Sequence, residues 1–145
     1  MIVHVMRRFL FTIKAFIVTA AMIGCIVFAY ALVHAPVFER GERYEFYTGT
    51  SSEEVVLARS PLEKLILSDI AGESVRYTGD RAEELIDRFH AEVLLVEKAA
   101  GVTNYYCYTS ALKGGVLLAG HIVNLHIAVS AKQTAAGTPV IFGGF

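Results

Sequence analysis

The stretch AFIVTAAMIGCIVFAYALVHA, from Ala15 to Ala35, decides how this chain of 145 residues is organised. It runs for 21 residues without Asp, Glu, Lys or Arg. A helix rises about 1.5 Å per residue, so about 20 apolar residues cross the roughly 30 Å hydrocarbon core of a bilayer. The stretch therefore predicts a helix long enough to span a membrane, with every backbone hydrogen bond made inside the helix.

The charges on either side of this stretch predict its orientation. Arg7, Arg8 and Lys14 precede it, and a mixture of acids and arginines between Glu39 and Arg43 follows it. Cationic side chains are retained on the cytoplasmic side of a membrane, which places the amino end inside the cell. The expected organisation has three parts: a cytoplasmic basic end at 1–14, a transmembrane signal anchor in the plasma membrane at 15–35, and an extracytoplasmic domain at 36–145.

Other fates of the apolar stretch stay open. Ala29-Tyr30-Ala31 has the small-x-small pattern of a cleavage site, although the run exceeds the apolar core of about 7–15 residues in a cleaved signal peptide. Met22-Ile23-Gly24-Cys25 loosely resembles the lipidation signal of a lipoprotein, but Ile26 to Val33 stay apolar where a lipoprotein normally turns polar. A buried core helix in a soluble protein is the remaining alternative.

Residues 36–145 have the composition of an acidic soluble domain. They hold ten Lys or Arg and fourteen Asp or Glu, a net charge of −4. Duplex DNA attracts cationic surfaces, so this balance argues against nucleic acid as a partner. The whole chain is 54% hydrophobic and has two cysteines, Cys25 and Cys107, which excludes intrinsic disorder and a disulfide scaffold.

Helix and strand signals alternate between Arg43 and Thr109. The sequence predicts three helices, over 51–59, 60–71 and 81–90, each from the residues at its start. The first two begin with capping boxes, at Ser51–Glu54 and Ser60–Glu63, and the third begins at Asp80–Glu83. A strand over Lys64–Ser68 competes with the second helix. Runs rich in aromatic and β-branched residues predict strands at 43–48, 73–78, 92–97 and 103–109, the third of them mostly buried.

The last part of the chain predicts further strands. Ile122 to Ser130 alternates, with Val123, Leu125, Ile127 and Val129 on one face and Asn124, His126 and Ala128 on the other. After a loop, Gly137-Thr138-Pro139 is expected to open a final strand over 140–142. Short turns between late strands predict antiparallel pairing. The expected fold class is α+β: an N-terminal transmembrane helix, then a small domain of mostly antiparallel sheet with helices packed on one face.

Two segments near the carboxyl end resemble the YwmB family. Asn124-Leu125-His126-Ile127-Ala128 is similar to the Asn-Leu-x-Ile-Ala strand of that family, and Gly137-Thr138-Pro139-Val140-Ile141 is similar to the Gly-Thr-Pro turn and strand that follow it. The resemblance implies an N-terminal export segment and a TATA-box-binding-like fold in a chain shorter than a full member. It does not imply DNA binding, because a fold does not carry a function.

No residue pattern predicts a catalytic, cofactor or metal site. Glu97, Cys107 and His126 are candidates for a zinc site across neighbouring strands, but zinc ligands usually occur in close pairs, and a hydrogen-bonded sheet histidine is favoured for His126. Cys107 lies within a predicted strand, not at a sharp turn or a helix start, so a nucleophilic role is disfavoured. Asn124 and Thr138-Pro139 suit structural roles.

Two tyrosines are the candidate partner surface. Tyr106 and Tyr108 share one face of their strand, opposite Tyr105 and Cys107, and either pack inside the domain or contact a partner. The expected function is that of a non-enzymatic, membrane-tethered extracytoplasmic binding protein with an envelope protein as partner and no cofactor. An envelope enzyme and a pilin-like filament subunit are the alternatives. The second lacks the processing Gly before the apolar run and the acid just inside it.

Overall fold

The structure, a computed structural model, describes the backbone of residues 2–49 and 55–142 and the side chains of 11–49 and 55–142. It consists of two compact units, residues 1–35 and residues 36–145, and we refer to the second as the C-terminal domain. The predicted capping box at Ser51–Glu54 lies outside the described residues.

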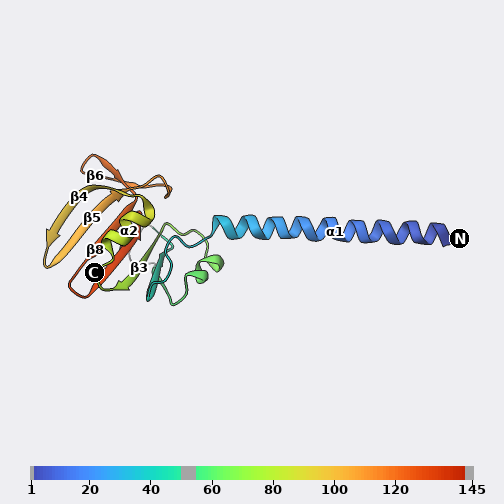
Figure 1. Cartoon of the computed structure of the whole chain (residues 1–145), viewed down its shortest axis with the longest axis horizontal. Helices are drawn as coiled ribbons and strands as arrows, with labels where there is room; N and C mark the ends of the chain where they lie inside the picture. Colours follow the sequence, from blue (N-terminus) through green and yellow to red (C-terminus); the bar gives the residue numbers. More distant parts are fainter. Residues whose placement is uncertain (1, 50–54, 143–145) are drawn as a thin grey trace. The chain divides into compact units, whose positions relative to one another are not determined.

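The first unit is one long helix, α1, from Ile2 to Val33 (Figure 1). Its segment Phe11–Val33 is apolar and, at 23 residues, long enough to cross a membrane, and none of it is buried. At its end the rings of Tyr30 and His34 stack with their centroids 4.0 Å apart. Such rings combine an apolar body with a polar edge, which suits the boundary between lipid and water. The helix fits both a signal anchor and a single span.

Within the described residues, seven strands form one antiparallel sheet in the C-terminal domain. Their bounds are β1 Arg43–Tyr47, β2 Val55–Ala58, β3 Gly72–Thr78, β4 Glu92–Ala99, β5 Val102–Tyr108, β8 Leu125–Val129 and β9 Gln133–Thr138. The order across the sheet is β2-β1-β3-β9-β8-β5-β4, so β2 and β4 are its edges. Figure 1 shows β8, β5 and β4 side by side.

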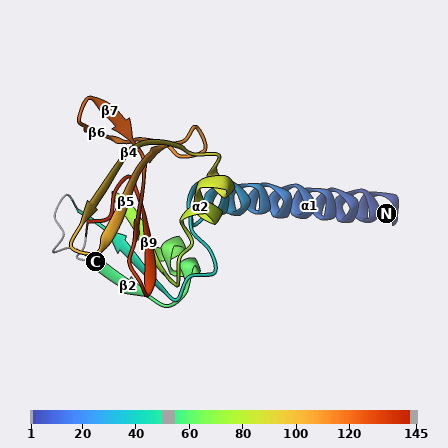
Figure 2. The ribbon, with the colours of Figure 1, turned by 60° about the vertical axis from the view of Figure 1, so that its left-hand side comes forward.

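A second, two-stranded sheet pairs β6 (Val116–Leu118) with β7 (His121–Val123). Figure 2 shows this hairpin extending beyond the end of the large sheet. β6 was not predicted from the sequence. The turn between the two strands uses positive φ angles at Ala119 (48°) and Gly120 (85°), a conformation that glycine adopts freely.

One face of the large sheet, the covered face, carries the core. The helix α2 (Ala82–Phe89) packs on it, and Figure 1 shows α2 crossing over β8. The core side chains include Phe38, Tyr44, Phe46, Val75, Leu85, Phe89, Cys107, Leu125 and Ile127. The predicted α+β class, with a mostly antiparallel sheet and helical segments on one face, is therefore confirmed. The opposite face, which no described helix covers, is called the open face below.

The helix predicted over 81–90 is confirmed. Its start is held by Asp80, whose Oδ1 accepts a hydrogen bond from Ala82 N at 2.9 Å. Its end is His90, which turns into the left-handed region at φ 48°. Leu85 and Phe89, which are four residues apart and share one face of the helix, are buried, whereas Ile86 is only partly buried.

The other two predicted helices differ from the structure. Val55–Ala58 is a strand that pairs with β1, where its β-branched residues fit a sheet better than a helix. The helix predicted over 60–71 is instead a short 3-10 helix, η1 (Pro61–Ile66), which begins with the predicted capping box. None of its residues is buried, and a helix without a packed face does not extend. Gly72, the residue that follows the helix predicted over 60–71, is the first residue of β3.

The strand predicted over 92–97 exists, but the prediction that it is mostly buried is wrong. β4 is an edge strand with only β5 beside it, and Val93, Leu95 and Val96 are 38%, 40% and 48% exposed. The pairing of β4 with β5 also shifts register between Val93 and Leu95, which is a bulge.

The carboxyl end differs most from expectation. β9 forms from QTAAGT, which was predicted to be a loop, whereas 140–142, predicted to be a strand, is not one. Gly137-Thr138-Pro139 therefore ends a strand instead of opening one, which agrees with the inability of proline to donate to a ladder. The Thr138–Pro139 peptide bond is cis. The strand predicted over 122–130 is divided at Asn124 into β7 and β8.

Candidate functional site

A row of residues crosses the open face from one edge to the other. Residues that pair directly across antiparallel strands point to the same face, so the register defines the row. Its members, one from each strand, are Leu57, Glu45, Ser74, Gly137, His126, Tyr106 and Leu95. Glu45, Ser74 and His126 are at most 9% exposed, although no described helix covers this face. We call this set the open-face row.

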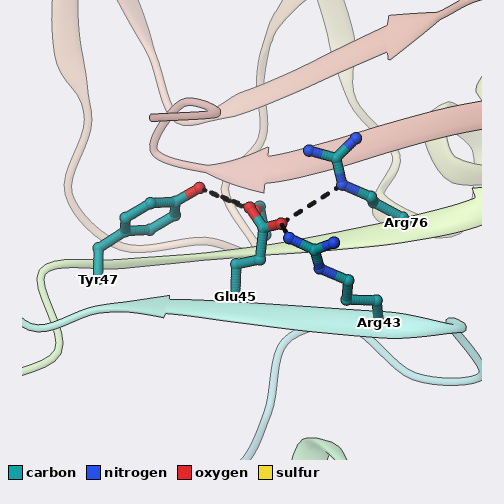
Figure 3. Close-up of polar contacts among 5 residues, drawn as sticks. Arg43, Glu45, Tyr47 and Arg76 are labelled. Atoms are coloured by element: carbon teal, nitrogen blue, oxygen red, sulfur yellow. Dashed lines mark hydrogen bonds and ion pairs between the residues drawn. The ribbon is translucent and has the colours of Figure 1, made fainter. Parts of the chain in front are cut away.

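Glu45 is the centre of a charged cluster at one side of the row (Figure 3). Its Oε1 lies 2.9 Å from Arg43 Nη2 and 3.4 Å from Arg76 Nε. Its Oε2 accepts hydrogen bonds from the hydroxyls of Tyr47 (3.1 Å) and Ser74 (3.3 Å). Figure 3 shows the two guanidinium groups on one side of the carboxylate and Tyr47 on the other. Both carboxylate oxygens of Glu45 therefore have partners, as expected of a buried charged group.

His126 organises the middle of the row. Its ring stacks on Tyr106 with centroids 4.5 Å apart, its Nε2 lies 3.1 Å from Asn104 Oδ1, and its Nδ1 accepts from Ile141 N at 3.3 Å. With Nδ1 as acceptor, Nε2 carries the proton and donates to Asn104. His126 is thus the hydrogen-bonded sheet histidine that the sequence favoured.

The segment after β9 folds back over the row at Gly137. A Cβ on Gly137 would meet Ile141 N at 2.9 Å, so only glycine permits this approach. Beyond it, the ring of Phe142 lies 4.7 Å from that of Tyr47. This segment explains how polar residues of the open face become buried. It also brings the two family-like segments together, because β8 and β9 pair through His126 with Gly137 and Ile127 with Ala136.

Asn124 is the best-connected residue of the family-like motif and is fully buried. Its Oδ1 accepts from Thr109 N at 2.8 Å, and its Nδ2 donates to the carbonyls of Thr109 (2.7 Å) and Leu112 (3.0 Å). These bonds tie the loop after β5 to the break between β7 and β8. The structural role predicted for Asn124 matches this geometry, and Leu125, Ile127 and Ala128 are buried beside it.

The candidate zinc ligands do not converge. Cys107 pairs with Leu125 on the covered face, whereas His126 lies on the open face. Glu97 is exposed and accepts a hydrogen bond from Tyr106 at 3.3 Å. Among the residues that the structure describes, no group of three His, Cys, Asp or Glu side chains is placed to hold a metal ion.

Cys107 is held in an unreactive form. Its side chain is fully buried, and burial raises the pKa of the thiol to about 11. The thiolate, which is the nucleophilic form, is therefore scarce at neutral pH.

The two tyrosines of the predicted partner surface have different surroundings. Tyr106 is half-buried against His126, and burial, followed by the charge of Glu97, raises the pKa of its hydroxyl. Tyr108, at the end of β5 and opposite Glu92, is 41% exposed. Of the pair, Tyr108 presents the more accessible ring.

A cavity of about 470 Å³ lies on another part of the C-terminal domain. It is lined by Glu39, Arg40, Tyr77, Arg81, Glu84, Leu85 and Arg88. Arg81 forms an ion pair with Glu84, and Arg88 lies 3.4 Å from Glu39, so most of the charge is balanced locally. The hydroxyl of Tyr77 donates to the carbonyl of Glu39 at 3.2 Å, and burial raises its pKa to about 12. This cavity has no signal in the sequence, since its residues come from three separate segments.

No family model, curated protein or solved structure matches this chain. The resemblance of its carboxyl end to the YwmB family stays a prediction.

The buried His126 predicts a loss of stability in mild acid. Burial lowers its pKa from 6.5 to about 4, so the unfolded chain binds a proton between these values while the folded chain does not. The free energy of unfolding therefore keeps the full contribution of neutral His126 above pH 6.5. It falls by about 3 kcal/mol as the pH drops to about 4. We expect urea unfolding at a series of pH values to show this loss, and we expect a smaller loss in His126→Gln. If the free energy of unfolding depends equally on pH in both proteins between pH 6.5 and about 4, His126 is not the residue responsible.

Proposed function

We propose that this chain is a non-enzymatic binding protein held in the plasma membrane by α1, with its amino end in the cytoplasm and its C-terminal domain outside the cell. The observation that carries the proposal is the contrast between the two units. Phe11–Val33 exposes a continuous apolar surface that water does not accommodate, whereas residues 36–145 form an acidic domain with its own core. The export segment implied by the YwmB resemblance agrees with this proposal.

The orientation is tested by labelling an added thiol in intact cells. Ser110 is exposed in the loop after β5, so Ser110→Cys should react with a membrane-impermeant maleimide without permeabilisation. The background is Cys25→Ser, and the buried Cys107 serves as the unreactive internal control. Labelling that appears only after the membrane is permeabilised would overturn the orientation. Mass spectrometry of the mature amino end separates an intact anchor from a cleaved or lipidated one.

The binding surface that we propose is the edge strand β4 together with Tyr108. β4 is eight residues long, lies at the edge of the sheet, and exposes Leu95 and Val96. An exposed apolar edge offers backbone groups to a further strand, and side-chain contacts beside it supply specificity. An extended segment of an envelope protein that adds to this edge would lie next to the half-exposed Tyr108 ring. Tyr106, which is engaged with His126, would support the edge from within.

A charge at Val96, beside the apolar centre of β4, is expected to weaken binding. With a photo-crosslinking residue in place of Tyr108, we expect one defined protein adduct in intact cells, and we expect Val96→Lys to reduce it about tenfold by blocking strand addition. Leu117→Lys is the matched control, because Leu117 is also apolar and exposed (76%) but lies on the β6–β7 hairpin. An adduct that survives Val96→Lys unchanged would exclude β4 as the binding edge.

A further inference from the structure

One buried carboxylate fixes the first residues of the C-terminal domain to the sheet. Glu73, in β3, is 3% exposed, and its Oε1 accepts hydrogen bonds from the N–H groups of Val37 (2.5 Å) and Phe38 (3.1 Å). The ring of Phe38 is 1% exposed and packs edge-on against Phe89, with centroids 5.7 Å apart. The chain therefore joins the domain at a defined point beside β3.

The same carboxylate holds η1 beside that point. The second oxygen of Glu73, Oε2, forms an ion pair with Lys64 Nζ at 2.5 Å. The start of η1 is fixed by its capping box, in which Glu63 Oε1 accepts from Ser60 N at 3.1 Å. Because Glu73 contacts both Lys64 and the first residues of the domain, η1 and Val37 are neighbours on the domain surface.

Two apolar side chains of η1 point into solvent. Leu62 is 63% exposed and Ile66 is 84% exposed, which makes Ile66 the most exposed large apolar side chain among the described residues. Single apolar residues are common on protein surfaces, so exposure alone indicates little. Their location, on a segment locked to the beginning of the domain, is the informative feature.

Covalent chain length limits how far η1 can be from the end of α1. Val37 follows Val33, the last residue of α1, by four residues, and four residues span at most about 14 Å. When α1 spans a bilayer, Val37 therefore stays within about 14 Å of the end of that helix, and η1 lies beside Val37 on the domain surface. Apolar side chains that reach the layer between headgroups and acyl chains are removed from water there.

We propose that Leu62 and Ile66 form a second membrane contact, which inserts into the interfacial layer of the bilayer that holds α1. This contact holds the C-terminal domain against the lipid surface. The inference rests on the proposed tether, since the short connection to α1 is what places lipid beside η1. It adds to the tether a second attachment that restricts the orientation of the domain.

The chain contains no tryptophan, so single-tryptophan variants report on one position each. The experiment reconstitutes the full chain in phosphatidylethanolamine and phosphatidylglycerol vesicles, with and without lipids brominated near the headgroup end of their acyl chains. We expect these lipids to reduce the emission of Ile66→Trp and Leu62→Trp about twofold, because the indole rings lie in the interfacial layer. Leu117→Trp, equally apolar and exposed on the β6–β7 hairpin, is the matched control and should not be quenched.

A fourth variant separates this inference from the proposed tether. Phe28→Trp lies within the candidate span, and it should be quenched by lipids brominated deeper in their acyl chains if α1 is inserted. Quenching of Phe28→Trp without quenching of Ile66→Trp or Leu62→Trp would overturn the second contact and leave the tether standing. Absence of quenching at Phe28→Trp would overturn the tether itself. Equal quenching at Leu117→Trp would also overturn the proposal, because lipid contact would then not be specific to η1.

Discussion

Replacing Glu73 by alanine is expected to lower the free energy of unfolding of the C-terminal domain by about 3–5 kcal/mol. The carboxylate is buried, forms an ion pair with Lys64, and accepts from two backbone N–H groups at Val37 and Phe38. Glu73→Ala removes the carboxylate that pairs with the poorly exposed ammonium group of Lys64 and leaves two buried N–H groups without their acceptor. Urea unfolding of the full chain in detergent micelles, followed by the near-ultraviolet circular dichroism of its tyrosines, measures the loss.

Two further variants identify the source of this effect. Glu83→Ala removes an exposed carboxylate from the first turn of α2 and should cost less than about 1 kcal/mol. Glu73→Gln keeps an oxygen that accepts from Val37 and Phe38 but loses the ion pair, so its loss should be intermediate. If Glu73→Ala costs no more than Glu83→Ala, Glu73 does not hold the start of the domain.

Asn124→Ala is expected to cost about 3 kcal/mol or more, because it leaves one backbone N–H and two carbonyl groups without their partners. These groups belong to Thr109 and Leu112, and Asn124 is fully buried. Pulse labelling of Cys107 in urea, in a Cys25→Ser background, follows the same region, since Cys107 O accepts from Asn124 N at 3.1 Å. In Asn124→Ala, the thiol of Cys107 should become reactive at a lower urea concentration than in the unsubstituted protein.

The matched control for Asn124 is Asn104→Ala. Asn104 is only partly buried and its side-chain Oδ1 has one partner, His126, so the expected loss is about 1 kcal/mol. Asn124→Asp keeps an acceptor for Thr109 N but places a carboxylate against two carbonyl oxygens, and should cost at least as much as Asn124→Ala. Equal and small losses at Asn124 and Asn104 would contradict a structural role for the motif.

Features with a local cause were predictable from the sequence. The apolar composition of Phe11–Val33 predicts α1, and the apolar spacing at Leu85 and Phe89 predicts α2 with its buried side. The capping box at Ser60 and Glu63 is present, but the length of the helix that follows it was overestimated. A cap determines where a helix begins, whereas packing decides how far it continues, and the packing partner is not visible in the local sequence.

Features that depend on distant contacts were not predictable. β9 contains Ala135 and Ala136, which favour strands poorly on their own, and becomes a central strand because it lies between β3 and β8. The exposure of β4 follows from its position at an edge, which only the strand order reveals. The role of Glu73 had no local signal, since the two backbone N–H groups that donate to it are 35 and 36 residues away along the chain.

The hydrogen bonds from Val37 and Phe38 to Glu73 also determine where a mechanical force enters the domain. A pull along the segment from His34 to Pro36 is transferred at Val37 and Phe38 to β3, the third strand from one edge, and to the aromatic core around Phe89. Such a load enters the large sheet at an interior strand and not at an edge strand. If α1 is the membrane tether that we propose, a pull on it would stretch the few residues between Val33 and Val37 before the load reached an interior strand of the domain.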